Sequence, residues 1–310
     1  MVLGVGSKRA DRAAPPPPEP LTPLIDAHTH LDACGARTTG QVRAALDRAE
    51  AVGVVAAVTI ADDLDSACWA ATAAGWDDRL YAAVALHPTR AGALDEHARA
   101  RIEELAAQPR VVAVGETGMD LYWPDRLEGC APPERQREAF AWHIDLAKRT
   151  GKPLMIHNRD ADDAVLDVLL AEGPPETVIF HCFSSGPAMA RRCVEAGWVL
   201  SLSGTVSFRN AGRLREAAPL IPPGQLLVET DAPFLTPHPF RGAPNEPYCL
   251  PYTVRALAEL LGRDPEQIAH ETTATARRVY GLPAAARPAG RPGGLRSPVA
   301  PATTDFRETR

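Results

Sequence analysis

The sequence has little of several features that would each indicate a particular class of protein. Its 310 residues contain only three lysines, Lys8, Lys148 and Lys152, and the formal net charge at pH 7 is −6. Proteins that attract nucleic acid over long distances usually carry a surplus of positive charge, and this chain has none. A substrate that contains phosphate would therefore have to be held locally, by metal ions and a few arginines.

Long apolar runs and paired cysteines are also missing. No run reaches the roughly 20 apolar residues that a membrane helix needs, and no apolar stretch follows the basic pair Lys8–Arg9. We therefore expect neither a membrane span nor a signal peptide. The six cysteines are scattered and none forms a CxxC pair, which favours free thiols in a reducing compartment. These absences predict a cytoplasmic protein.

Proline is abundant at both ends of the chain and predicts the domain boundaries. Residues 1–22 are small, polar and proline-rich, with the run "APPPPEPLTP", and residues 284–310 have a similar composition. Such stretches are typical of disordered segments with some polyproline stiffness. Residues 23–283 are long enough for one large α/β domain with a sizeable core. We see no sign of a protein partner in the sequence.

Eight short apolar runs alternate with helical patterns through the central domain. The runs are nearly continuous in Val, Ile, Leu and Ala, as in parallel strands that are covered on both faces. This alternation predicts an α/β fold, a (β/α)8 TIM barrel. A doubly wound sheet is the alternative, but the Gly-rich turn that it needs after the first strand is absent. The expected strands are 24–30, 53–61, 80–87, 111–117, 153–158, 177–183, 198–203 and 226–231.

The expected helices fill the gaps between these strands. The clearest covers residues 133–150, because it begins with Pro-Glu, carries a regular apolar face and stops at Gly151. A further helix near 265–280 is expected to close the domain. The other helices are expected at about 39–51, 63–74, 94–107, 160–171, 186–196, 210–218 and 251–261.

Residues that can bind a metal end five of the eight strand-like runs. A parallel barrel exposes its chemistry at the C-terminal ends of its strands, so these side chains should meet. Each one alone is explained as well by a satisfied core histidine or a structural ion pair. Six together, with almost no other charge in the same strands, indicate a two-metal hydrolase site. The six metal-ligand candidates are His28, His30, Glu116, His157, His181 and Asp231.

The carboxylate of Glu116 is expected to bridge two ions. Asp26 and Glu229 each lie two residues before a candidate ligand, and we expect Asp26 to orient an imidazole and Glu229 to support the site. The first ion would be held by His28, His30, Glu116 and Asp231, and the second by Glu116, His157 and His181.

From about Leu24 to Gly281 the chain resembles the TatD family of metal-dependent deoxyribonucleases, within the amidohydrolase-like barrels. The resemblance implies a divalent-metal hydrolase of phosphodiesters, with 3′-5′ exodeoxyribonuclease activity on DNA ends, either single strands or 3′ termini. It carries the family's metal ligands onto the same six residues. The matching stretches, in order, are "IDAHTHLD", "LHP", "VGETGMD", "QREAFAWHIDLAKRTGKPLMIHNRDA", "HCFSSGPAMA", "LVETDAPFLTP" and "RGAPNEP".

The mechanistic hypothesis is attack on phosphorus by a hydroxide that bridges two divalent ions. Mg²⁺ or Mn²⁺ suits turnover, and Zn²⁺ is a further candidate because it binds imidazole strongly. The expected catalytic residues are Glu116, as the bridge, and Asp231, which would accept or relay the proton of the attacking water. The expected substrate-binding residues are His87, Arg159 and Arg241, which lie at or just beyond strand ends.

Aromatic residues near the expected mouth of the barrel are candidates for stacking on a base of a single strand. For each of them, ordinary packing is the competing explanation. Trp123 and Phe208 are favoured because both lie in loops after strands. The full set is Tyr122, Trp123, Phe183, Phe208 and Phe234.

Two other functions compete with phosphodiester hydrolysis. The first is an amidohydrolase-type enzyme for a small amide, ester or lactone. Relatives of that type commonly bridge their metals with a carbamylated lysine on the fourth strand, whereas none of the three lysines here lies at a strand end. The second is a barrel retained only for interactions, which the intact ligand set disfavours.

Overall fold

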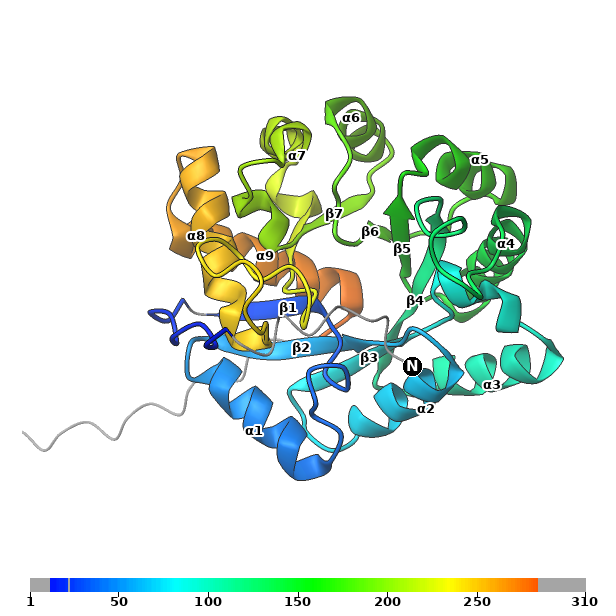
Figure 1. Cartoon of the computed structure of the whole chain (residues 1–310), viewed down its shortest axis with the longest axis horizontal. Helices are drawn as coiled ribbons and strands as arrows, with labels where there is room; N and C mark the ends of the chain where they lie inside the picture. Colours follow the sequence, from blue (N-terminus) through cyan, green and yellow to red (C-terminus); the bar gives the residue numbers. More distant parts are fainter. Residues whose placement is uncertain (1–11, 22, 284–310) are drawn as a thin grey trace, which may run out of the picture.

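The computed structural model describes residues 12–21 and 23–283, and its eight strands form one parallel sheet in the order β1 to β8. A bridge between Thr29 and Ala232 brings the two ends of this sheet together. The predicted (β/α)8 barrel is thereby confirmed (Figure 1). The strands are β1 (Leu24–Thr29), β2 (Val54–Ile60), β3 (Leu80–Val84), β4 (Val111–Asp120), β5 (Leu154–Arg159), β6 (Val178–Phe180), β7 (Val199–Leu202) and β8 (Leu226–Val228).

Helices surround the strands on the outside of the barrel (Figure 1). Local chemistry sets their ends: Thr38 caps the first helix in a reciprocal pair with Gln41, and Gly151 ends the fourth with a φ of 64°. The α-helices are α1 (Thr39–Glu50), α2 (Leu64–Ala73), α3 (Glu96–Ala106), α4 (Pro133–Thr150), α5 (Asp162–Glu172), α6 (Pro187–Glu195), α7 (Gly212–Ala217), α8 (Leu250–Leu261) and α9 (Pro265–Tyr280).

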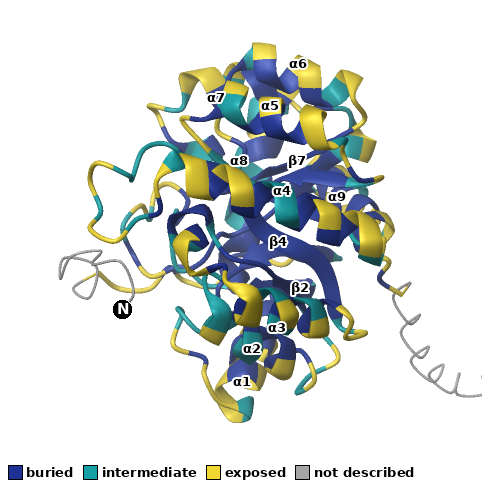
Figure 2. Ribbon diagram, turned by 90° about the vertical axis from the view of Figure 1, so that its right-hand side faces the viewer, coloured by how far each residue is buried: buried dark blue, intermediate teal, exposed yellow. Residues whose placement is uncertain are grey.

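The core has two layers, one outside the sheet and one inside the barrel. The outer layer packs strand residues such as Val114 and Phe180 against the inner faces of the helices, whose outer faces are exposed (Figure 2). The inner layer packs residues such as Val58 and Ile179 against the last turn of α9. Hydroxyls of α9 bind the carbonyls of Pro23 and Pro223, which precede β1 and β8. Since α9 covers the N-terminal ends of these strands, the opposite end is left for the site.

Glycine lets strand β4 lie unusually close to β5. A Cβ atom on Gly118, whose φ is +132°, would lie 2.2 Å from the carbonyl oxygen of His157. A Cβ atom on Gly115 would lie 2.4 Å from the Cβ of Met155. These two glycines flank Glu116, so the close approach of the strands brings Glu116 beside His157.

Part of the proline-rich leader packs on the barrel, in contrast to the disorder expected for residues 1–22. Residues 12–21 run along α8, and Pro15, Pro18 and Leu21 are buried. The carbonyl groups of Pro15, Pro16 and Glu19 accept hydrogen bonds from Tyr248, Tyr252 and Arg255, respectively. An extended proline segment cannot pair all its carbonyls internally, so side chains of the barrel satisfy them. The remaining leader residues and the tail, 284–310, lie outside the described residues.

Two expectations from composition can be compared with the structure. All six cysteines are free thiols. Within residues 12–21 and 23–283, no helix combines the length and the apolar character that crossing a membrane requires.

Candidate metal centre

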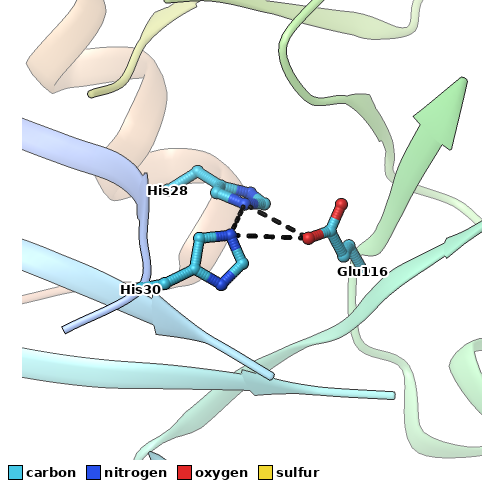
Figure 3. Close-up of side chains that lie close together, drawn as sticks. All are labelled: His28, His30 and Glu116. Atoms are coloured by element: carbon cyan, nitrogen blue, oxygen red, sulfur yellow. Dashed lines mark hydrogen bonds and ion pairs between the residues drawn. The ribbon is translucent and has the colours of Figure 1, made fainter. Parts of the chain in front are cut away.

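The six predicted ligands come together at the C-terminal end of the barrel. Figure 3 shows His28 and His30, from β1 and the residue that follows it, pointing toward Glu116 of β4. His157 lies on β5, His181 directly follows β6, and Asp231 lies three residues beyond β8. All except His157 are buried, and His157 is half-buried. Strands β6 and β8 are shorter than expected, so their ligands stand on the loops that the strands position.

Four side chains make the first group of donor atoms. The Nε2 atoms of His28 and His30 are 3.1 Å apart. Oε1 of Glu116 lies 3.6 Å from the first of these nitrogens and 3.5 Å from the second. Oδ1 of Asp231 lies at the same two distances, 3.6 and 3.5 Å. Two nitrogens and two carboxylate oxygens therefore surround one point.

A second group uses the other oxygen of Glu116. Its Oε2 lies 3.0 Å from Nδ1 of His157 and 2.7 Å from Nε2 of His181. These two nitrogens are 3.2 Å apart. Glu116 thus presents one oxygen to each group, which is the arrangement of a bridging carboxylate.

The spacing of the donors fits metal ions. An ion bound at about 2.1 Å by nitrogen and oxygen holds neighbouring ligand atoms about 3.0 to 3.4 Å apart, depending on octahedral or tetrahedral geometry. The distances within both groups, from 2.7 to 3.6 Å, bracket that range. The residues present therefore suit two divalent ions.

The outward nitrogen of each imidazole faces a group outside the donor groups, within hydrogen-bond distance for His28 and His157 and as a longer carboxylate contact for His30 and His181. This is the usual arrangement of metal-binding histidines, because the outer acceptor fixes the tautomer and leaves the inner nitrogen free to coordinate. The four pairs are His28 Nδ1 with Met155 Sδ at 3.2 Å, His30 Nδ1 with Asp62 Oδ1 at 3.5 Å, His157 Nε2 with Asp120 Oδ2 at 3.1 Å, and His181 Nδ1 with Glu229 Oε1 at 3.5 Å.

The electrostatics of the pocket favour an ionised Glu116 and a neutral His28. Burial raises the pKa of Glu116, but the nearby His181 and His87 outweigh it and hold that pKa well below its ordinary value. Burial, and then the charge of His181, lower the pKa of His28 to about 4. A deprotonated carboxylate and a neutral imidazole are the forms that bind metal. Burial lowers the pKa of the other three imidazoles, but nearby carboxylates outweigh it and raise the pKa of His30, His157 and His181 above the ordinary value, so a bound cation would displace their protons.

The backbone of Asp231 is held in a left-handed conformation with a φ of 51°. Aspartate tolerates this region better than most residues. Its N–H donates to the carbonyl of His28 at 2.9 Å, and its own carbonyl accepts from the N–H of Phe234 at 2.8 Å. These bonds direct the side chain toward His28 and His30.

Asp26 does not orient an imidazole, so that expectation is wrong. Its carboxylate instead accepts from the N–H of Thr230 at 2.9 Å and from the hydroxyl of Thr230 at 2.6 Å. Burial raises the pKa of Asp26 to about 8. The same carboxylate also accepts from the backbone N–H of His28, at 3.4 Å, and not from its ring. Asp26 joins β1 to the segment after β8.

Sequence reasoning missed Asp62 and Asp120. Asp62 lies after the end of β2, and Asp120 lies beyond residue 117, where we expected the fourth strand to end. Strand β4 in fact runs to Asp120, where the carboxylate is fully buried and faces His157. The signal was present in the motif "GETGMD", whose final carboxylate ends the strand.

The three expected substrate-binding residues lie around the donor groups at different distances. The ring centroids of His87 and His157 are 4.4 Å apart. Arg159 is exposed at the end of β5, with its guanidinium 4.1 Å from the ring centroid of Tyr122. Arg241 is exposed in the loop after β8 and lies 4.4 Å from the ring centroid of Phe208. The structure thus places His87 next to the donor groups and each arginine on an aromatic ring.

The barrel and its donor set define a metal-dependent hydrolase of the TIM-barrel type. The alternative bridging group of such barrels, a lysine, is not available from the described lysines. Lys148 binds the carbonyl of Glu172 on the surface, and Lys152 precedes β5 and binds the carbonyl of Val111.

Comparison with known proteins identifies the family. A family model described as TatD related DNase matches residues 25–281. A Mycobacterium tuberculosis protein named as an uncharacterized metal-dependent hydrolase, TatD, is 72% identical over 259 residues, covering 84% of this chain and 98% of that protein. The chain therefore belongs to the TatD related DNase family, and it is a TatD-type metal-dependent hydrolase.

Two further relatives have informative names or structures. A protein of Erwinia billingiae named 3′-5′ ssDNA/RNA exonuclease TatD is 36% identical over 211 residues, covering 66% of this chain and 78% of that protein. The crystal structure of YJJV, a TatD homologue of Escherichia coli K12, superposes with a TM-score of 0.76 at 29% identity, covering 84% of this chain and 98% of that one.

Proposed function

We propose that this protein is a 3′-5′ exonuclease that removes nucleotides from single-stranded DNA ends, with two divalent ions bridged by Glu116. The observation that carries the proposal is the division of the Glu116 oxygens between two groups of donors. The printed name of the Erwinia relative supports the substrate class. The ions proposed for turnover are two Mg²⁺ or two Mn²⁺, and Zn²⁺ is proposed as a more tightly bound substitute.

Bound ions would supply a nucleophile at neutral pH and neutralise charge on the phosphate. Asp231 is the proposed proton acceptor, because Oδ1 faces the two imidazoles of the first group and the side chain is partly open to solvent. Its backbone hydrogen bonds keep the carboxylate in that position. Glu116 holds the two donor groups in a fixed relation to each other.

His87 is the proposed donor to a phosphate oxygen. Burial, and then the charge of His157, lower its pKa to about 3, so the ring is neutral at pH 7. Its Nδ1 accepts from the backbone N–H of Thr89 at 3.2 Å. The proton of the neutral ring therefore lies on Nε2, from where it can be donated to substrate.

Arg159 and Arg241 are the proposed contacts to the strand beyond the reacting phosphate. Both are exposed: Arg159 is the last residue of β5, and Arg241 lies in the loop after β8. In a chain with a net charge of −6, such local cations replace the general basic field of many nucleic-acid-binding proteins. The free cysteines support a reducing cytoplasm as the compartment.

The test is digestion of single-stranded DNA labelled at its 5′ end, with Mg²⁺ or with EDTA. We expect a ladder that shortens from the 3′ end, and we expect EDTA or a 3′-terminal phosphorothioate to block it. A protein that cleaves no DNA with any divalent ion, but hydrolyses a small ester or lactone, would contradict the proposal and favour the amidohydrolase-type function.

A further inference from the structure

Two aromatic rings and two arginines form a ledge at the ends of β4 and β5. The ledge consists of Tyr122, Trp123, Arg126 and Arg159. The guanidinium of Arg159 lies 4.1 Å from the ring centroid of Tyr122 and 5.3 Å from that of Trp123. That of Arg126 lies 4.5 Å from the Tyr122 ring. The two rings meet edge to face, with centroids 5.0 Å apart.

Asp120 fastens this ledge to the candidate metal centre. One oxygen of its buried carboxylate lies 3.1 Å from Nε2 of His157. The other accepts from the backbone N–H groups of Tyr122 and Trp123, at 3.0 and 3.1 Å. A single carboxylate therefore fixes both a metal-ligand candidate and the backbone that carries the two rings.

The loop that carries the ledge is also braced from outside. The buried side chain of Gln136, on α4, binds the N–H and the carbonyl of Asp120 at 2.8 and 3.0 Å. The N–H of Leu121 binds the carbonyl of Arg159 at 3.0 Å. The start of the loop is thus held in place before any ligand binds, which lowers the entropy cost of binding there.

The ledge has the composition of a site for single-stranded nucleic acid. Such sites combine aromatic rings, on which bases stack, with cations that follow the phosphates. Both rings are only half-buried, and both arginines are exposed. Among the ion pairs of the described residues, neither Arg126 nor Arg159 has a carboxylate partner. Their charges are therefore available to an anionic ligand.

We propose that the ledge binds the base of the 3′-terminal nucleotide, stacked on Trp123, while Arg126 and Arg159, which lie against the Tyr122 ring, contact the next phosphate of the strand beyond the reacting one. This proposal rests on the exonuclease function and adds a binding site to it. It makes the ledge a determinant of specificity, because a strand end without a base would lose the stacking contact. Asp120 is a positioning residue that sets the distance between the base and the reacting phosphate.

The test compares Trp123→Ala with Trp142→Ala. Trp142 is also half-buried and has an arginine, Arg99, 5.3 Å from its ring centroid, but it lies on α4. We expect Trp123→Ala to raise the KM for single-stranded DNA on the order of ten-fold, the effect of losing one base–aromatic stack. Trp142→Ala should leave the KM unchanged.

A second substrate separates stacking from general damage. An oligonucleotide with an abasic analogue at its 3′ terminus has no base to stack, so wild type and Trp123→Ala should hydrolyse it with the same KM. An equal KM for both proteins on ordinary DNA would overturn the ledge proposal, as would an equal ten-fold loss on the abasic substrate. Failure of the exonuclease function is distinguishable, because the wild type would then cleave neither oligonucleotide.

Discussion

At the scale of single residues, the centre depends on side chains that each face two partners. Glu116 faces both donor groups, and Asp120 faces both His157 and the loop that follows β4. Burying these carboxylates is costly unless their charge is matched. The surrounding imidazoles provide that match in the protein as described, and bound cations would provide it more fully.

Asp231→Asn tests the proposed proton acceptor. Asparagine keeps the shape of the side chain but cannot accept the proton, so turnover should fall about 100-fold or more. The measurement is the rate of single-stranded DNA hydrolysis at saturating Mn²⁺, with the melting temperature as a control for folding. Near-normal turnover would remove Asp231 from the chemistry.

His143 makes a prediction about pH and stability. It is fully buried on α4, its Nδ1–H donates to the carbonyl of Ala139 at 2.7 Å, and burial lowers its pKa to about 4. The unfolded chain binds a proton near pH 6.5 and the folded protein does not. His143 therefore lowers stability as pH falls from 6.5 toward 4, by on the order of 2 to 3 kcal/mol.

The measurement for His143 is urea unfolding of metal-free protein at pH 7 and pH 4.5. The other histidines titrate as well, so the comparison is with His143→Gln, which cannot gain a proton. The loss of unfolding free energy between the two pH values should be smaller in the variant. An equal loss of unfolding free energy in both proteins would contradict the prediction, because it would mean that folding does not lower the pKa of His143.

At the scale of elements, the contact between β4 and β5 sets the geometry of the second donor group. We predict that Gly118→Ala lowers the free energy of unfolding by about 2 to 4 kcal/mol, because the added carbon meets the His157 carbonyl at a positive φ. Metal affinity should fall as well. Equilibrium unfolding and metal titration measure the two effects.

Gly40→Ala is the matched control for that substitution. Gly40 lies in the first turn of α1, and nothing lies within 4 Å of an added Cβ. It should leave stability unchanged or raise it by up to about 1 kcal/mol. Equal effects of the two substitutions would contradict the role given to the close approach of β4 and β5.

Much of the architecture could be predicted from local patterns, and the exceptions have physical causes. The clustering of the six candidate ligands could be predicted because each follows an apolar run, and the barrel brings such positions together. The role of Asp26 could not be predicted, because its partner Thr230 lies 204 residues away along the chain. Asp120 was missed because a strand containing two glycines and two carboxylates continues past the point where its apolar run ends.

At the scale of the whole molecule, residues 12–21 act as a strap on the barrel. Leu21 binds Val52 near β2, and Arg12 binds the carbonyl of Arg241 in the loop after β8. The strap therefore connects the outer face of α8 with a loop at the mouth. The proline-rich composition of this segment predicted disorder. Its packing could not be predicted from the sequence, because the side chains that bind it are distant along the chain.

Truncation tests the strap. A variant that lacks residues 1–19 loses the contacts with Tyr248, Tyr252 and Arg255, so its melting temperature should fall by a few degrees, corresponding to about 1 to 2 kcal/mol. A variant that lacks residues 1–11 keeps all three contacts and is the control. Equal melting temperatures for the two variants would show that the strap adds nothing to stability.

The division of Glu116 between two groups of donors is tested most directly by electron paramagnetic resonance of the protein titrated with Mn²⁺. Ions that share a carboxylate lie about 3.5 to 4 Å apart and couple magnetically. The account predicts two Mn²⁺ per chain with a spin-coupled spectrum, which Glu116→Ala abolishes. Saturation at one Mn²⁺ per chain, with the six-line spectrum of an isolated ion, would contradict it.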